Sequence, residues 1–402
     1  MPQKDTRDIV TVYRASGEPT AILNNLRRCT KCAIPETQET IVFDEAGVCN
    51  VCRQQEYKQS QIDWAERARE FAALVDEYRG KHDYDCIVPL SGGKDSTFTL
   101  YELVTRHRVK PLVVTFDHGF LRPTTLANTE RTIKKLGVDY LKYRPSWKVV
   151  QKLMLESLHR KGDFCWHCHT GIFSYPMQIA VKFKVPLVVW GEPSAEYTSY
   201  YGYDEPEEVD ERRFNRFVNL GITAEDMLGM LGGEVTMRDL EPFAYPPPAE
   251  LRKLNVRSVC LGSYMPWNVK DQVEIIAREL GWQGAAVEGV PPGYEYEKIE
   301  CAMQGVRDYL KFIKRGFART SHLTSIDIRN GRMTREEAAR LIEQHEGQRP
   351  PSLDVFLEYV GLTEAEFMDI AMSHQVSPNA HDPGAVRPGA PLWDQPLWDR
   401  SR

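Results

Sequence analysis

The stretch of this chain that most clearly indicates chemistry is Ser-Gly-Gly-Lys-Asp-Ser at residues 91–96. Its two glycines permit a tight turn and let backbone N–H groups approach an anion. The lysine supplies a cation, the aspartate a ligand for Mg²⁺, and the helix that follows adds free N–H groups and a positive dipole end. The predicted phosphate-binding residues are Ser91, Gly92, Gly93, Lys94, Asp95 and Ser96, of which Ser91, Lys94, Asp95 and Ser96 are predicted to be catalytic.

Two Cys-x-x-Cys pairs near the start of the chain, separated by 16 residues, have the spacing of a tetrahedral thiolate site for Zn²⁺. A segment this small has too little core to fold by itself, so a bound metal would supply its folding energy. The pattern leaves no obvious open coordination position, which indicates a structural metal. The predicted zinc ligands are Cys29, Cys32, Cys49 and Cys52.

Apolar runs alternate with helical patterns around the glycine turn, and this order predicts an α/β fold, a doubly wound parallel sheet with helices on both faces. The turn falls between the first strand and the helix that follows it. From about residue 298 the chain has the pattern of helices only. The predicted strands are 86–90, 111–116, 138–143, 185–190 and 258–264, and the predicted helices are 63–80, 95–108, 124–137, 147–161, 173–184, 268–281, 299–315, 334–346, 352–360 and 363–374.

The chain has 402 residues, 42% of them hydrophobic, which is enough for two or three domains. We expect four parts along it. These are an N-terminal segment with the zinc knuckle (1–60), a nucleotide-binding domain (61–285) with an insertion at about 191–250, a helical region (286–375) and a flexible Pro/Gly-rich tail (376–402).

The Ser-Gly-Gly-Lys-Asp-Ser turn resembles the PP-loop of the ATP pyrophosphatases, which belong to the adenine-nucleotide α-hydrolase superfamily. Such enzymes hold the pyrophosphate of ATP, usually with Mg²⁺, while a substrate oxygen attacks the α-phosphate. In that superfamily the end of the second strand contacts the adenine and the ribose. The resemblance therefore implies that Thr115, Phe116 and Asp117 contact the nucleotide.

A third pair, Cys165-x-x-Cys168, precedes the fourth strand and admits several interpretations. It is a redox or persulfide pair, or a metal or substrate-pocket element assisted by His167 and His169, or two packed thiols. Certain PP-loop tRNA thiolases carry such a pair as part of an Fe–S cluster, with a distant third cysteine; here Cys260 or Cys301 would fill that role. That resemblance implies a sulfurtransferase that thiolates a tRNA base or a small molecule through the catalytic residues Cys165 and Cys168.

The chain also resembles the N-acetyl sugar amidotransferases of bacterial surface-polysaccharide pathways, over about residues 27–374. Three segments carry the likeness: the cysteine knuckle at 27–53, the Cys-Trp-His-Cys segment at 164–197, and a helical segment at 308–344. The resemblance implies that the amide oxygen of an N-acetylated, usually nucleotide-linked sugar attacks the α-phosphate of ATP. Pyrophosphate leaves, ammonia adds to the activated carbon, and AMP departs to give an acetamidino sugar, a step suited to lipopolysaccharide O-antigen biosynthesis.

Two segments are candidates for contacts to this substrate. Ligands of parallel sheets bind at the carboxyl ends of the strands, so the acidic, aromatic segment 191–208 after the fourth strand is well placed, unless it is a solvated loop. The basic run 311–319 matches a diphosphate, unless it is an ordinary basic helix face. The candidates are Gly191 and Glu192 for the nucleotide, Glu192, Glu196, Tyr197, Lys311 and Lys314 for the sugar, and, with weaker claims, Arg315, Arg319, Arg329 and Arg332.

The chain has neither the nucleophile elbow nor the N-terminal cysteine of the known glutaminase classes, so ammonia is expected from solution or a separate glutaminase subunit. In the pathways that the chain resembles, that partner is similar to the glutaminase and cyclase pair of histidine biosynthesis. The net charge of −6 argues weakly against nucleic acid. No apolar stretch reaches the ~18 residues of a membrane span, and six of nine cysteines lie in Cys-x-x-Cys pairs, so we expect a cytoplasmic protein.

Overall fold

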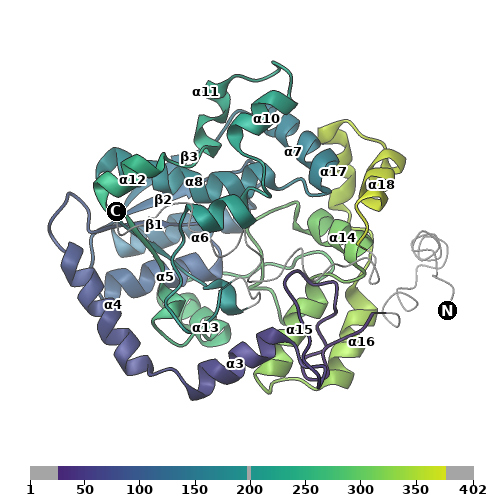
Figure 1. Ribbon diagram of the computed structural model, residues 1–402, viewed down its shortest axis with the longest axis horizontal. Coiled ribbons are helices and arrows are strands. Elements are labelled where there is room, and N and C mark those ends of the chain that lie inside the picture. Colours follow the sequence, from purple (N-terminus) through teal and green to yellow (C-terminus); the bar gives the residue numbers. More distant parts are fainter. Residues whose placement is uncertain (1–25, 197–200, 377–402) are drawn as a thin grey trace.

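A five-stranded parallel sheet forms the centre of the molecule in a computed structural model that describes residues 26–196 and 201–376 (Figure 1). Its strand order is β3-β2-β1-β4-β5, so β1 is central and its carboxyl end lies between those of β2 and β4. This sheet confirms the predicted fold class. The strands are β1 (Cys86–Pro89), β2 (Pro111–Phe116), β3 (Asp139–Tyr143), β4 (Leu187–Trp190) and β5 (Arg257–Cys260).

Helices cover both faces of the sheet because neighbouring residues of each buried strand point to opposite sides. Cys86 and Val88 pack in one core with α4, α5 and α13, whereas Ile87 packs in another with α8 and α12. The helices of this part are α3 (Asn50–Ser60), α4 (Trp64–Tyr78), α5 (Lys94–Thr105), α6 (Pro123–Leu136), α7 (Trp147–Lys161), α8 (Trp166–Phe183), α12 (Pro248–Leu254) and α13 (Val269–Leu280).

The region predicted as an insertion consists of short helical pieces and leads from β4 to β5. A capping box in which Thr223 and Asp226 exchange hydrogen bonds starts its longest piece before α12. The pieces are the 3₁₀ helix η1 (Ser194–Glu196), α9 (Glu211–Arg213), the π-helix η2 (Phe214–Val218), α10 (Ala224–Met230), α11 (Met237–Leu240) and the 3₁₀ helix η3 (Glu241–Phe243).

The C-terminal part of the described chain is helical, as predicted. Phe356 and Phe367 from this part share one hydrophobic core with Val150 and Met154 of α7. The C-terminal helices therefore pack directly against a helix of the sheet layer and do not form a core of their own. The helices are α14 (Gln304–Arg315), α15 (Arg319–Arg329), α16 (Arg335–His345), α17 (Ser352–Val360) and α18 (Glu364–Ser373).

Several elements differ from the prediction, among them α3, which was not predicted, and α14, which begins at Gln304 and not at 299. Helix α8 begins at Trp166, not at 173, so the Cys-x-x-Cys pair forms its first turn, with Cys165 as the N-cap residue. Helix α15 was not predicted, because its threonines and serines have low helix propensity. In the structure the Thr324 hydroxyl donates to the carbonyl of Thr320 within the helix. Strand β5 ends at Cys260, and the rest of the predicted strand is the 3₁₀ helix η4 (Leu261–Ser263).

The cysteine knuckle docks on the C-terminal helices, beside α15 and α16 in Figure 1. Arg315 at the end of α14 donates to the carbonyl oxygen of Thr37 at 2.8 Å and pairs with Glu39 at 2.7 Å. Arg335 of α16 donates to the carbonyl oxygen of Cys29 at 2.6 Å. The two ends of the described chain are therefore joined directly by charged hydrogen bonds, which are stronger than neutral ones.

Candidate active site

The Gly-Gly turn lies between β1 and α5, at the carboxyl edge of the sheet. Gly92 has a φ of +81°, and a Cβ there would lie 2.5 Å from Thr129 Oγ1 and 2.8 Å from Thr125 Cγ2 of α6. The indole N–H of Trp282 donates to the Gly92 carbonyl at 3.1 Å. The turn therefore requires glycine at this position, and packing from two helical segments fixes its conformation.

The two serines of the turn hold it closed. The Ser91 N–H donates to the Ser96 hydroxyl at 3.1 Å, and the two hydroxyl oxygens are 3.0 Å apart. Gly93 is the N-cap of α5 and has no side chain to occupy the free N–H groups of the first turn. Those N–H groups and the positive end of the helix dipole are therefore available to a phosphate.

Lys94 is a buried cation held between two carboxylates. Its Nζ lies 2.7 Å from Asp95 Oδ2 and 2.9 Å from Glu297 Oε1, and the side chain is 4% exposed. Burial alone would lower the pKa of Lys94, but the charges of Asp95 and Glu297 outweigh it and raise that pKa well above the ordinary value. The lysine is therefore charged, and Glu297 is a site residue that the sequence pattern did not reveal.

Two carboxyl groups beside the turn are suited to a divalent cation. Asp95 Oδ1 is buried and has no hydrogen-bond partner among the described residues, although its other oxygen holds Lys94. Glu300 lies directly over the turn, since a Cβ on Gly93 would meet its Oε1 at 1.8 Å. Mg²⁺ prefers a few carboxylate ligands together with phosphate oxygens. The predicted metal role of Asp95 therefore fits this geometry.

A cavity of about 280 Å³ opens beside the turn. It brings together residues that are predicted from separate motifs, and it adds Glu300 from the segment before α14. The predicted residues on its wall are Ser91, Asp95, Ser96, Phe116, Cys165, Cys168, His169, Gly191, Glu192 and Cys301.

Thr115 and Asp117 do not line this cavity. The Thr115 hydroxyl donates to the carbonyl of Leu90, and the buried Asp117 carboxylate pairs with Lys142 and Arg144. Burial opposes ionisation of Asp117, but these two cations lower its pKa below the ordinary value. The roles of Thr115 and Asp117 as nucleotide contacts stay predictions. Both side chains already make structural contacts at the end of β2.

A second cavity, of about 410 Å³, adjoins the first and shares five wall residues with it, namely His169, Phe173, Glu192, Lys298 and Arg307. Its other walls come from distant parts of the chain: Gln38 and Glu39 of the knuckle, the aromatic rings of Trp267, Tyr294 and Tyr296, and helix α15. A third cavity, of about 260 Å³, also includes His169 and Arg307 on its wall. The three spaces therefore meet around these two residues.

Glu192 lies between the first two cavities and carries a shifted pKa. Burial, followed by the charge of Asp95, raises the pKa of this carboxyl to about 8. A carboxyl that titrates near neutral pH is a candidate for proton transfer.

Two of the other predicted substrate residues, Glu196 and Lys314, are already held by contacts within the protein. The Glu196 carboxylate is held by Lys58 and by the hydroxyl of Tyr203, although it lines the second cavity. Lys314 donates to the carbonyl oxygens of Lys161 and Gly162 at 3.2 and 2.7 Å.

Tyr197 lies outside the described residues. Arg315 binds the knuckle, Arg329 donates to the Glu196 carbonyl, and Arg332 pairs with Asp327. Arg319 lies 3.3 Å from Asp308, and both Arg319 and Lys311 line the second and third cavities. Burial lowers the pKa of Lys311 to about 8.

Cys301, rather than Cys260, joins the third cysteine pair. Cys165, Cys168 and Cys301 all line the first cavity, whereas the Cys260 sulfur lies at the end of β5, 3.8 Å from an Arg213 nitrogen. Burial raises the pKa of Cys301 to about 11 and also raises those of Cys165 and Cys168 above the ordinary value. The three are therefore protonated thiols at neutral pH, a form with weak nucleophilicity.

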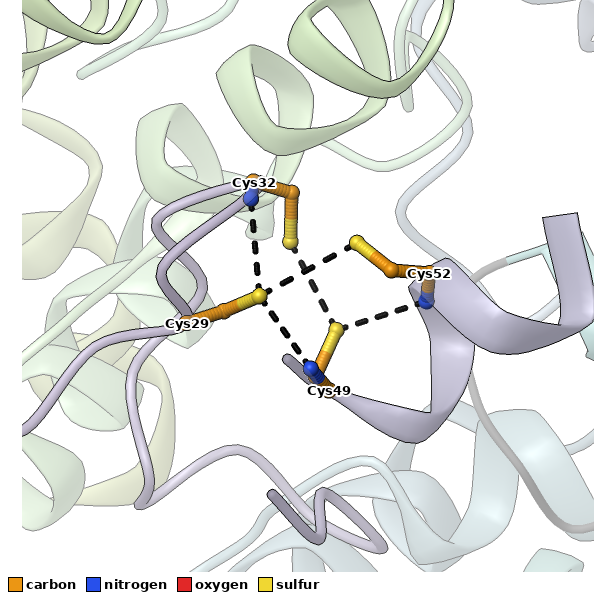
Figure 2. A group of neighbouring side chains, drawn as sticks. All are labelled: Cys29, Cys32, Cys49 and Cys52. Carbon is orange, nitrogen blue, oxygen red and sulfur yellow. Dashed lines mark hydrogen bonds between the residues drawn. The ribbon is translucent and has the colours of Figure 1, made fainter. Parts of the chain in front are cut away.

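The four N-terminal cysteines form a compact, buried cluster in which the sulfur atoms point toward a common centre (Figure 2). All four lie within 4.8 Å of one another, with 3.9 Å between Cys29 and Cys52 and 3.6 Å between Cys32 and Cys49. Four sulfurs at ~2.3 Å from one metal in a tetrahedron lie about 3.8 Å apart. The cluster therefore fits a single tetrahedral metal ion.

Sequence comparison identifies the C-terminal part. Residues 293–381 match the family described as LPS biosynthesis protein WbpG-like, C-terminal domain. Residues 293–381 are therefore similar in sequence to this domain and form the WbpG-like domain of the chain only in that sense. This match, to a family whose description names lipopolysaccharide biosynthesis, supports the predicted resemblance to the sugar amidotransferase family. The WbpG-like domain contains α14 to α18 and the wall residues Lys298, Glu300 and Arg307 of the first cavity.

Among solved structures, the chain is similar to the U34-tRNA thiolase NcsA from Methanococcus maripaludis, determined with its [4Fe-4S] cluster. The two share 14% sequence identity, the match covers 88% of this chain and 98% of that chain, and the TM-score is 0.30. No curated protein matches the sequence. In the ranges 26–196 and 201–376, no helix has both the length and the apolar character that a membrane crossing requires.

The metal cluster can be tested by elemental analysis. Cys49→Ser should lower the bound metal from about one ion per chain to near zero and lower the melting temperature, because the knuckle loses its folding energy. Cys86→Ala, at a buried cysteine of β1 outside both clusters, is the control and should keep the full metal content. Equal metal in the two variants would show that the four sulfurs do not hold the ion.

The glycine turn can be tested with a matched pair of variants. Gly92→Ala should weaken Mg·ATP binding at least about tenfold, because the new Cβ displaces the turn from α6. Gly137→Ala, in the left-handed C-cap of α6 with nothing within 4 Å, imposes similar backbone strain without a contact and should leave ATP binding unchanged. Calorimetric affinities that match in both variants would contradict the assignment of the turn.

Proposed function

We propose that this protein is an ATP-dependent, AMP-forming amidotransferase that converts the acetamido group of an N-acetylated, nucleotide-linked sugar into an acetamidino group. The observation that carries the proposal is the pair of adjoining cavities. One is lined by Ser91, Asp95 and Ser96 of the glycine turn, and the other is formed largely by the WbpG-like domain and the knuckle. The two cavities share five lining residues, so an acceptor in the second cavity would lie next to a nucleotide in the first.

The reaction has two steps that this arrangement suits. The amide oxygen of the acceptor bonds to the α-phosphorus of ATP, the bond to the bridging oxygen breaks, and pyrophosphate leaves with the electron pair. Ammonia then adds to the imidate carbon, loses a proton, and expels AMP. Lys94 and the N–H groups at the start of α5 hold the pyrophosphate, which stabilises the charge that develops on it. Asp95 and Glu300 would hold Mg²⁺, which neutralises phosphate charge when bound.

Glu192 is proposed as the proton acceptor in the second step. The attacking ammonia becomes a cation as its bond to carbon forms, and it must lose a proton before AMP leaves. Glu192 lines both cavities and has a pKa of about 8, so its deprotonated form is a base of suitable strength.

The second cavity has the composition of a sugar site. The rings of Trp267, Tyr294 and Tyr296 provide flat apolar surface, and polar groups around them can orient hydroxyls. Arg307 and Lys311 are the cations on this wall that are proposed to meet the diphosphate of the carrier. We propose that ammonia comes from a separate glutaminase subunit, that the knuckle metal is Zn²⁺, and that the enzyme works in the cytoplasm, where ATP and nucleotide sugars are available.

The proposed activity is tested by AMP formation from ATP, ammonium and a panel of N-acetylated nucleotide sugars. Lys94→Ala and Asp95→Asn should each lower the rate by at least about a thousandfold, because the pyrophosphate and its counter-ion lose their ligands. Lys134→Ala, at a side chain that is 78% exposed on α6, is the control. Turnover that survives both changes would rule out this phosphate site.

A second candidate function is sulfur transfer to a tRNA base or a small molecule. The observation that favours it is the position of Cys165, Cys168 and Cys301 on the wall of the nucleotide cavity. Three thiols around one space are suited to an Fe–S cluster. Against it stand the acidic net charge of −6 and the WbpG-like domain.

The two candidates are separated by metal content and absorbance of protein purified without air. Nitrogen transfer predicts about one zinc per chain and no absorbance near 400 nm. Sulfur transfer through a cluster predicts iron and a visible band that Cys165→Ala and Cys301→Ala remove, while Cys260→Ala does not. Iron of that kind would favour the second candidate.

A further inference from the structure

Lys298 lies where the two cavities meet, in a segment held tightly over the phosphate-binding turn. It lines both cavities. The preceding residue, Glu297, pairs with Lys94 of the turn, and the carbonyl of the following residue, Ile299, accepts a hydrogen bond from Thr125, which also packs on Gly92. The position of the Lys298 backbone is therefore fixed relative to the turn by the residues on either side.

The backbone of Lys298 is in a conformation that lysine rarely adopts. Its φ is +48°, in the left-handed region that favours glycine and asparagine. Such conformations persist where neighbouring contacts impose them, and they gather at functional sites. Here Glu297 and Ile299 are both held by contacts to the turn and to α6, and the residue between them lines the cavity.

The charge of the Lys298 ammonium is also not paired with a carboxylate in the described residues. Within the described parts of the chain it makes no hydrogen bond or ion pair, whereas Lys94 is matched by two carboxylates. The charge of Lys298 acts through space on Glu192 and Glu297 and lowers the pKa of both carboxyl groups, without a direct contact to either. With Lys94 balanced by Asp95 and Glu297, and with Glu300 over the turn, the fixed groups at the turn are net negative. A triphosphate there needs further positive charge.

We propose that Lys298 is a second phosphate-binding cation, which contacts the α-phosphate from the side of the acceptor cavity, opposite to Lys94 and the helix start. The proposal deepens the proposed function and rests on it for the adenylyl-transfer step. There the acceptor oxygen bonds to the α-phosphorus while the bond to pyrophosphate breaks. Lys298 transfers no proton; its charge offsets that of the non-bridging oxygens as the acceptor approaches.

The test uses a substitution that keeps the backbone and removes the charge. Lys298→Asn suits the left-handed conformation, since asparagine tolerates it. The matched control is Lys184→Asn, at an exposed lysine with a φ of +57° in the C-cap of α8, away from the cavities. The probe is α,β-methylene-ATP with Mg²⁺, which binds without reacting, and Lys298→Arg tests whether the charge suffices.

Calorimetry should show about a tenfold weaker affinity for the analogue in Lys298→Asn, less than about a threefold change in Lys298→Arg, and none in Lys184→Asn. AMP formation should fall further than the affinity does in Lys298→Asn. Equal analogue affinity in Lys298→Asn and the wild type would overturn the proposal, whatever the effect on turnover. Thermal melting checks the fold, and Lys298→Gly replaces Lys298→Asn if the latter is unstable.

This design separates the inference from the proposed function. If the wild type forms no AMP with any N-acetylated sugar, the proposed reaction is wrong, but analogue binding still decides whether Lys298 contacts the nucleotide. If the wild type is active and analogue binding is unchanged by Lys298→Asn, the reaction stands and the role of Lys298 falls.

Discussion

The buried ion pair between Lys94 and Glu297 is the contact on which the rest of the site depends. Lys94 starts α5 in the sheet layer, and Glu297 lies about two hundred residues later, at the edge of the WbpG-like domain. Removing such charges from water costs several kcal/mol for each ion, and only close pairing offsets that cost. The pair therefore holds the segment 297–301 against the phosphate-binding turn, and this segment provides walls for both main cavities.

Much of the fold follows from local pattern, because parallel strands buried on both faces form short apolar runs such as those of β1, β2 and β4. The turn and the four knuckle cysteines were predicted from spacing, and the structure places each set together. Helix α15 was missed because its Thr/Ser-rich sequence is helical only when its hydroxyls find partners inside the protein. The early start of α8 was missed for a different reason, because a Cys-Trp-His-Cys sequence has no amphipathic pattern that would indicate a helix.

The site was less predictable than the fold, because pairing between distant charges leaves no mark in local sequence. Lys314 and Arg315 belong to one basic run with Lys311, yet the structure uses the first two to bind backbone carbonyls and the knuckle. Glu297, Lys298 and Arg307 contribute to the cavities without belonging to any motif. Their role comes from the packing of the C-terminal domain on the sheet, which only a three-dimensional structure reveals.

The knuckle has a consequence for the order in which this protein becomes active. Gln38 and Glu39 line the second cavity, the proposed acceptor site, together with α15, and some 280 residues separate these two walls in the sequence. Chains are synthesised from the N-terminus, and domains generally fold as units during synthesis. The β1–α5 turn is therefore synthesised long before the second cavity is complete, because that cavity forms only when α15 has emerged and docked on the knuckle. A nascent chain that ends before α15 thus has the glycine turn but lacks one wall of the cavity in which the acceptor is proposed to bind.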